Sequence, residues 1–354
     1  MKLFTVGPVE MFPQTLHIAS EQLPYFRTPE FSELMFENER LFKASIRAAK
    51  NSKTVFLTTS GTGAMEAAVI NCFGDEDKLL VINGGGFGKR FAEICQIHGI
   101  SYDELKLDFG EVLTEERLNG FDGSKYTGLL VNLHETSTGQ LYDINLISAY
   151  CRKYGLYLVV DAISTYLADK IEFDAMEIDV LIVSSQKALA LSPGLSVMEI
   201  SERIYRNRVL KMPIRSMYLD FKSHIKNMER GQTPFTPAVG ILLELNERLK
   251  QIETTGVDEI QTEIHVLAER FRRELKTREF RIPEYPLSNA LTPVLLEPNA
   301  REIYEQLKSK YGIMVTPSGG ALEKVLIRVG HLGNVKWDDY EVLLNAMEQI
   351  RENL

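Results

Sequence analysis

The sequence predicts an α/β protein with a mostly parallel sheet in a large domain and a second, smaller α/β domain at the C-terminal end. From about residue 54 to 200, short apolar runs rich in β-branched residues alternate with segments of helical periodicity. This is the pattern of parallel strands covered by helices on both faces. At 354 residues the chain is too long for one core, so about two domains are expected.

The composition indicates an ordinary globular protein. Hydrophobic residues make up 44% and charged residues 25% of the chain, and the formal net charge is −9. This acidity, together with the lack of a lysine and arginine stripe that could follow a phosphate backbone, argues against nucleic acid as a partner. No run of 18 apolar residues occurs and Met1–Pro8 lacks a signal peptide's apolar region, so we expect no membrane partner and a cytoplasmic location. Three cysteines without CxxC spacing predict no metal site.

The first strand leads into a helix start suited to phosphate. Residues 1–20 are expected to be extended and to pack with the small domain, and a helix is expected over about 31–50. The strand 54–58 then runs into small residues that open a helix. There, unpaired N–H groups and the hydroxyls of Ser60 and Thr62 can hold a phosphate. A glycine-rich helix start without a ligand is the alternative.

Glycines and an aromatic residue follow the next strand, 78–82. The three consecutive glycines, 84–86, allow a positive φ or a close approach of the backbone to a ligand. Phe87 beside them is poorly placed for a core residue and suits stacking on a flat ring. Packing of Phe87 on a neighbouring helix, as a loop anchor, is the alternative.

Two further strands end in polar residues. The strand 127–132 is followed by the polar cluster His134–Gly139, at the end where open α/β sheets bind ligands. The strand 156–160 stops at Asp161, and an aspartate at that position is costly to bury without a cationic partner or hydrogen bonds. A helix N-cap is the alternative role for Asp161.

Lys187 follows the apolar strand 180–183 after three polar residues. Partial desolvation at the end of a buried strand lowers the pKa of a lysine amine and makes it a carbonyl nucleophile. A solvated strand end is the alternative for this lysine taken alone. Because all of these polar groups come just after strands, we expect them to gather along one edge of the sheet.

The remaining chain comprises an irregular segment and the smaller domain. The strand 195–200 is followed by a basic stretch, about 201–235, that is expected to be irregular. Further elements are expected in this order: a helix from about 238, a helix over 258–276, a strand over 293–297, a helix over 299–310, strands at 312–315 and 324–330, and a helix over 337–352. The predicted divisions are an N-terminal segment packing with the small domain (1–20), the large domain (21–240) and the small domain (241–354).

Several short motifs together resemble a known enzyme family. The matching pieces are Gly7–Pro8, Arg27–Phe31, Ser60–Glu66, Asn83–Arg90, His134–Gly139, Asp161–Ala162, Ser185–Lys187 and Arg328–Gly330. In this order and spacing, the sequence resembles the class-V, fold-type I pyridoxal-phosphate aminotransferases. It is most similar to the branch of alanine–glyoxylate, serine–glyoxylate and 2-aminoethylphosphonate–pyruvate transaminases. The resemblance covers almost the whole chain and implies a large domain with a mostly parallel seven-stranded sheet, plus a smaller C-terminal α/β domain.

The resemblance implies how the cofactor, pyridoxal 5′-phosphate, is held. Lys187 would form the internal aldimine, a Schiff base, and Asp161 would pair with the protonated pyridine nitrogen so that the ring is an electron sink. Phe87 would stack on one face of the ring, at a position where relatives often carry tryptophan, and Ile163 would pack on the other face. Phe26 departs from the family pattern, because many relatives carry histidine there.

The remaining site residues are also implied by the resemblance. The phosphate-binding positions are matched by Ser60, Gly61, Thr62, Gln186 and Thr236. Thr236 would come from the other subunit, which implies a homodimer with shared active sites. Thr138 would lie near the ring hydroxyl, and Arg328 would bind the substrate's carboxylate through the two prongs of its guanidinium.

The implied activity is transamination in two half-reactions. A small donor (alanine, serine or 2-aminoethylphosphonate) would give its amino group to a small 2-oxo acid (glyoxylate or pyruvate) by a ping-pong aldimine and ketimine mechanism. A lyase or desulfurase on the same fold is one alternative, although desulfurases need a mobile cysteine, usually in the C-terminal half, and the last cysteine here is Cys151. A nucleotide-binding protein is another, although no GxGxxG pattern opens the first strand–helix unit.

Overall fold

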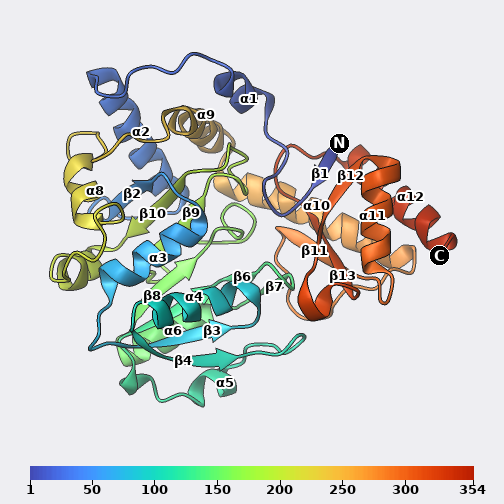
Figure 1. Cartoon of the computed structure of the whole chain (residues 1–354), viewed down its shortest axis with the longest axis horizontal. Coiled ribbons are helices and arrows are strands. Elements are labelled where there is room, and N and C mark those ends of the chain that lie inside the picture. The colour runs from blue at the N-terminus through green and yellow to red at the C-terminus, as the bar shows by residue number, and fades with distance from the viewer.

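The computed structural model describes residues 1–354 as a large and a small body, each built on its own sheet (Figure 1). The strands of the large sheet, in spatial order, are β2 (Lys53–Leu57), β10 (Ser196–Ile200), β9 (Val180–Ser184), β8 (Tyr157–Asp161), β5 (Gly128–Asn132), β3 (Lys78–Asn83) and β4 (Ser101–Lys106). The five strands from β9 to β4 are parallel, whereas β10 is antiparallel to both of its neighbours. The mostly parallel seven-stranded sheet implied by the resemblance is therefore confirmed.

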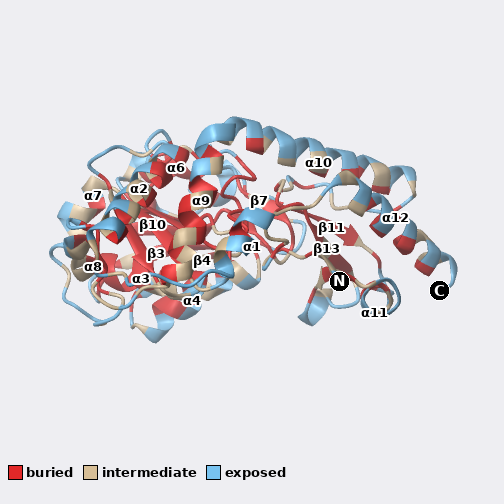
Figure 2. Cartoon of the chain, turned by 90° about the horizontal axis from the view of Figure 1, so that it is seen from above, coloured by how far each residue is buried: buried red, intermediate tan, exposed pale blue.

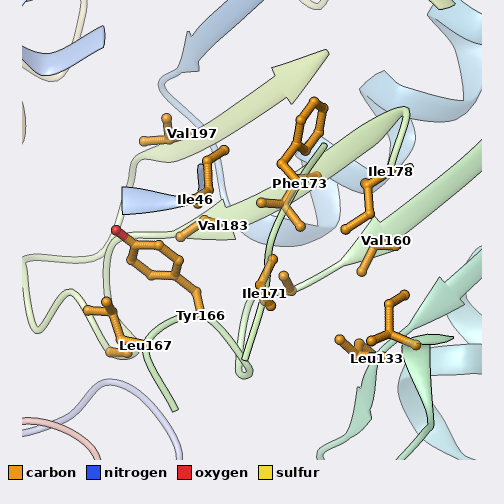
Figure 3. Close-up of a cluster of buried hydrophobic side chains, with 14 of the residues drawn as sticks. Ile46, Leu133, Val160, Tyr166, Leu167, Ile171, Phe173, Ile178, Val183 and Val197 are labelled. Carbon is orange, nitrogen blue, oxygen red and sulfur yellow. The ribbon is translucent and has the colours of Figure 1, made fainter. Parts of the chain in front are cut away.

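The large sheet separates two hydrophobic cores, because alternate side chains of a strand point to opposite faces. Leu181 and Val183 of β9 lie in one core, and Val180 and Ile182 lie in the other. The first core takes residues from α2 (Pro29–Ser45), α6 (Ile144–Tyr154) and α9 (Val239–Thr255), and the second from α3 (Gly61–Cys72), α4 (Gly86–Ile97) and α8 (Phe221–Met228). Figure 3 shows part of the first core, where Val183 lies near Tyr166.

The small body combines the two ends of the chain. Its sheet has the order β1 (Lys2–Phe4), β12 (Ile313–Pro317), β13 (Leu326–Gly330) and β11 (Leu291–Leu295). Figure 1 shows β1 beside the C-terminal strands, and β1 runs parallel to β12. A third hydrophobic core lies between this sheet and three helices, α10 (Val257–Thr277), α11 (Ala300–Tyr311) and α12 (Trp337–Glu352).

Helix α10 connects the two bodies. Ile260 near its start packs in the first core of the large body, whereas Phe271 and Leu275 pack in the core of the small body. Figure 2 shows that much of its outer face is exposed. The domain boundary at residue 240 stays a prediction, and the packing of α9 against the large body favours a position further along the chain. No helix, this longest one included, has the length and apolarity needed to cross a bilayer.

The expectation of an irregular stretch over 201–235 was partly wrong. Helices α7 (Glu202–Ile204) and α8 lie within it. Asp220 caps α8 by accepting hydrogen bonds from Lys222 N and Ser223 N, and Phe221 and Ile225, one turn apart, are buried. Because this stretch contains many basic residues, its sequence did not indicate the short amphipathic helix α8.

Six other elements were not expected from the sequence. They are α1 (Pro13–Ala19), α4, α5 (Glu115–Asn119), strand β4 and the two short strands of a hairpin, β6 (His134–Glu135) and β7 (Gln140–Leu141). β4 is an edge strand that pairs only with β3, and Leu105 is its single buried residue. Because edge strands can expose charged side chains, β4 lacks the apolar run that marks the interior strands.

Candidate active site

The candidate site lies where neighbouring parallel strands end. β8 pairs with β9 so that Asp161 lies opposite Ile182, and Lys187 follows five residues later. A cavity of about 130 Å³ lies at these strand ends. Eight residues expected from the sequence line it: Ser60, Gly61, Thr62, Phe87, Asp161, Ile163, Gln186 and Lys187. A larger open groove of about 1010 Å³, beside α10, contains none of the residues expected at the site.

Lys187 is held in a nearly dry environment. Only 8% of the residue is exposed. Burial lowers the pKa of its amine to about 8, against the opposing effect of Asp161, and the charges of Arg328 and Arg90 lower it further. Gly7 lies against its aliphatic chain, since a Cβ at that position would come within 2.5 Å of Lys187 Cδ. The amine is thus prepared to act as a nucleophile near neutral pH.

Asp161 is a buried carboxylate without a close cationic partner. Its Oδ1 accepts one hydrogen bond from Ile163 N, at 2.8 Å. Burial raises its pKa to about 6, although the Ile163 N–H and the charge of Lys187 act in the opposite direction. A carboxylate held in this way would gain stability from a cationic N–H placed in the cavity. The N-cap role is not adopted, because no helix begins at this residue.

Two apolar side chains, Phe87 and Ile163, form walls of the cavity. Gly61 allows the start of α3 to approach Ile163, because a Cβ on it would lie 2.3 Å from Ile163 Cδ1. Phe87 N donates to the Glu135 carboxylate, which also accepts from Gly88 N at 3.1 Å. This buried carboxylate therefore caps the start of α4 and fixes the position of Phe87.

The glycines before Phe87 serve the protein's own packing. A Cβ on Gly84 would lie 2.0 Å from the Tyr142 hydroxyl, and one on Gly85 would lie 2.4 Å from Ser137 Oγ. None of the three glycines has a φ in the left-handed region. In this structure, the close backbone approach that these glycines allow is to the segment after β5, and an approach to a ligand stays a prediction.

The start of α3 offers unused hydrogen-bond donors to the cavity. Ser60 is the N-cap residue, yet its hydroxyl makes no capping hydrogen bond. The first N–H groups of an α-helix have no partner within the helix, and the positive end of the helix dipole lies there. Gln186 brings a side-chain amide to the same cavity. This end fits an anionic group such as a phosphate.

Thr136, and not Thr138, lines the cavity. Thr136 Oγ1 lies 2.9 Å from Ser164 Oγ, which also lines it. Thr138 is buried in the turn between β6 and β7, where its Oγ1 donates to the carbonyl of Glu135. The contact near the ring hydroxyl that the resemblance gave to Thr138 therefore fits Thr136 better.

Arg328 reaches the edge of the site from β13 of the small sheet. Its Nη1 donates to the carbonyl of Thr136 at 2.8 Å and its Nη2 donates to the carbonyl of Pro317 at 2.7 Å. Its Nε atom is buried without a hydrogen-bond partner, and no carboxylate lies within 4.0 Å of the guanidinium. Burial lowers its pKa to about 10, so it stays charged at neutral pH.

Thr236 does not line the cavity of its own chain. It is exposed on the loop before α9. The loop nevertheless lies close to the start of α3, because Ala238 N donates to Thr58 Oγ1 at 3.0 Å. Its neighbour Phe235 stacks on Tyr218, whose hydroxyl donates to the carbonyl of Thr58.

His134 lies in the predicted polar cluster but does not suit a role as a base. Both ring nitrogens are buried without hydrogen-bond partners. Burial, and then the charges of Lys187 and Arg328, lower its pKa to about 3. The imidazole is therefore neutral at physiological pH.

Four more residues line the cavity that the sequence analysis did not single out. They are Met65, Arg90, Thr136 and Ser164. The packing of the complete fold brings them to the cavity, and their positions in the sequence alone do not indicate it.

These features fit pyridoxal 5′-phosphate. A buried carboxylate without a cation matches a protonated pyridine nitrogen, the apolar walls match a flat ring, and the free donors at the start of α3 match a phosphate. A buried lysine with a lowered pKa matches the aldehyde. Together the fold and the cavity define a fold-type I enzyme that depends on pyridoxal 5′-phosphate (PLP).

Comparisons with known proteins identify the family. The family model described as "Aminotransferase class-V" matches residues 25–331, and the chain belongs to this family of PLP-dependent aminotransferases. The chain is 27% identical to the "Soluble hydrogenase 42 kDa subunit" of Anabaena cylindrica, over 99% of this chain and 93% of that one. It is 25% identical to the L-aspartate–glyoxylate aminotransferase of Paracoccus denitrificans, over 94% and 86% of the two chains.

The solved structures agree with this assignment. The crystal structure of an alanine–glyoxylate aminotransferase from Nostoc sp. superimposes with a TM-score of 0.92 and 26% sequence identity. The match covers 99% of this chain and 94% of that one. The chain is therefore an aminotransferase, and its cofactor is pyridoxal 5′-phosphate.

Proposed function

We propose that this aminotransferase moves an amino group from a small anionic donor to a small 2-oxo acid. Alanine, serine and 2-aminoethylphosphonate are the proposed donors, and glyoxylate and pyruvate are the proposed acceptors. The observation that carries the proposal is Arg328, a guanidinium at the edge of the cofactor cavity without an acidic partner. An aminotransferase of glyoxylate among the similar proteins supports the proposal.

Arg328 is well suited to hold an anion. Its two hydrogen bonds to backbone carbonyls fix the plane of the guanidinium, and they leave its positive charge uncompensated. A carboxylate or phosphonate would accept charge-assisted hydrogen bonds from such a group. The carbonyl of Thr136 couples this arginine directly to the cavity wall. The proposed site thus selects donors with an anionic group near the amine.

The roles of the other residues follow from their environment. Bound at Lys187, the cofactor supplies an electron sink for the electrons that remain when the Cα–H bond breaks. Lys187 is the group we propose for taking the Cα proton and returning it, because its lowered pKa suits general base and general acid catalysis near pH 8. Asp161 is proposed to hold the positive charge on the pyridine nitrogen. Arg328 orients the substrate so that this proton faces Lys187.

The cysteines argue against a desulfurase. Cys72, Cys95 and Cys151 are all buried in helices of the large body. Burial raises the pKa of each thiol, to about 12 for Cys95, so none is a ready thiolate nucleophile. Three free cysteines also suit a reducing compartment, which supports the cytoplasmic location that we propose.

We further propose a homodimer in which Thr236 of one subunit contributes to the cofactor site of the other. Thr236 is exposed beside the start of α3 but does not line the cavity of its own chain. Ile214 and Met217 nearby are 63% and 79% exposed, and the aromatic pair Tyr218 and Phe235 lies beside them. Exposed apolar side chains gathered in this way are typical of a surface that packs against another protein.

A half-reaction screen of the purified holoenzyme tests the proposed function. Single amines are added without an acceptor, and loss of the visible absorbance of the lysine-bound cofactor is followed. We expect alanine, serine or 2-aminoethylphosphonate to remove the absorbance, and ethylamine, which lacks an anionic group, to leave it unchanged. Equal reaction with ethylamine, or none with any anionic donor, would overturn the proposal. Release of pyruvate from serine without an acceptor would identify a lyase instead.

A further inference from the structure

Arg90 is the only cationic residue besides Lys187 that lines the cofactor cavity. It lies on α4, one turn after Phe87. Its Nη1 donates to Thr62 Oγ1 at 2.9 Å, and its Cζ lies 4.9 Å from the centre of the Phe87 ring. These two contacts fix the guanidinium between the start of α3 and an aromatic wall of the cavity.

Arg90 forms no salt bridge within the chain. No carboxylate lies within 4.0 Å of its guanidinium, whereas the neighbouring Lys89 pairs with Glu93 at 3.1 Å. Arginine in a fixed orientation without an acidic partner is arranged to receive an anion, because its remaining N–H groups are free to donate. The hydrogen bond to Thr62 points this cation toward the phosphate-binding end of the cavity.

The other groups at that end are uncharged. Ser60, Gly61, Thr62 and Gln186 supply hydroxyls, N–H groups and an amide. A phosphate monoester carries a charge of about −1.5 to −2 near pH 7, which neutral donors and a helix dipole compensate only in part. We propose that Arg90 is a further cofactor-binding residue that neutralises the phosphate dianion within the same subunit as Lys187. This inference rests on the cofactor assigned above.

The electrostatics of the site agree with this role. The charge of Arg90 is felt inside the cavity, where it lowers the pKa of both Lys187 and Asp161 after the larger effects of burial. A bound phosphate would compensate this charge. With its charge compensated by the phosphate, Arg90 would not repel the protonated pyridine nitrogen, which is the proposed partner of Asp161.

Binding of two cofactor forms to the apoenzyme tests the proposal. Dissociation constants are measured for pyridoxal 5′-phosphate and for pyridoxal, which lacks the phosphate, by titration of protein fluorescence and visible absorbance. The dissociation constant of pyridoxal divided by that of pyridoxal 5′-phosphate reports the contribution of the phosphate. In Arg90→Gln we expect the ratio to fall about tenfold or more, as for loss of a hydrogen bond to a charged group. Arg90→Lys should keep part of the contribution.

The controls separate this role from a structural one. Lys89→Gln removes the adjacent exposed charge and should leave the ratio unchanged. Equal weakening of both ligands in Arg90→Gln, or no change in the ratio, would overturn the role of Arg90. So would a change confined to the KM of anionic donors. If the wild-type apoenzyme binds neither form of the cofactor, the cofactor assignment itself fails.

Discussion

Replacement of Asp161 by asparagine should stabilise the apoenzyme and impair the holoenzyme. Burial raises the pKa of this carboxyl from 3.8 to about 6, and each pH unit corresponds to about 1.4 kcal/mol. The ionised side chain therefore destabilises the folded apoenzyme by roughly 3 kcal/mol above pH 6. Because the folded-state pKa is raised, this penalty develops as pH rises from about 4 to 6 and falls below about 1 kcal/mol at pH 4.

Thermal unfolding of the apoenzyme measures this effect. An entropy of about 2.1 cal/mol/K per residue converts 3 kcal/mol into a rise of roughly 4 °C at pH 7.5 if all 354 residues unfold together. Asp143→Asn is the matched control, because Asp143 is an exposed N-cap and asparagine caps equally well. With the cofactor bound, Asp161→Asn should lose its advantage and lower kcat by about 100-fold or more. An apoenzyme variant that melts at or below the wild-type temperature would refute the reasoning.

Three further outcomes are expected. The rate at which the apoenzyme captures pyridoxal 5′-phosphate should increase with pH, with a midpoint near pH 8, because only the neutral amine of Lys187 attacks the aldehyde. A midpoint near pH 10 would contradict the effect of burial on this pKa. Arg328→Met should raise the KM for anionic donors by about tenfold to a hundredfold, and an unchanged KM for every donor would contradict its role. Thr236→Ala should speed the loss of cofactor during dialysis, while light scattering should still show a dimer. Full activity in a monomer would contradict the shared site.

The position of the site could be predicted because parallel strands carry a strong pattern. β8 and β9 are buried on both faces, so each appears as an apolar run followed by a polar residue. The polar residues after such runs must lie on the same edge of the sheet, and this rule alone is enough to bring Asp161 and Lys187 together. The roles given to Ser60, Phe87 and Gln186 stay predictions, although these residues line the cavity as expected.

Residues whose roles depend on a turn or on a neighbouring element could not be predicted in this way. The tight hairpin between β6 and β7 turns Thr136 toward the cavity and Thr138 away from it, and two threonines two residues apart look alike in sequence. Arg90 reaches the cavity only because α3 and α4 begin side by side, so that it can bond Thr62. Glu135 has no signal of its own, because it accepts hydrogen bonds from backbone N–H groups of α4 and from the side chains of Asn132 and Ser137, and only the fold brings α4 to it.

The charges of this site explain why a cofactor and a substrate are needed to complete it. Burial is the largest cause of three pKa shifts in the site. It raises the pKa of Asp161 and lowers those of Lys187 and Arg328, so it favours the neutral form of each group. Isolated buried charges destabilise a folded protein, and a chain selected only for stability would pair or replace them. In the proposed site, the pyridinium, the aldehyde and the anionic group of the donor would be the partners of Asp161, Lys187 and Arg328, respectively. Binding of these groups would therefore remove a destabilisation that folding leaves in place, and the same charges would give the folded protein affinity for its ligands.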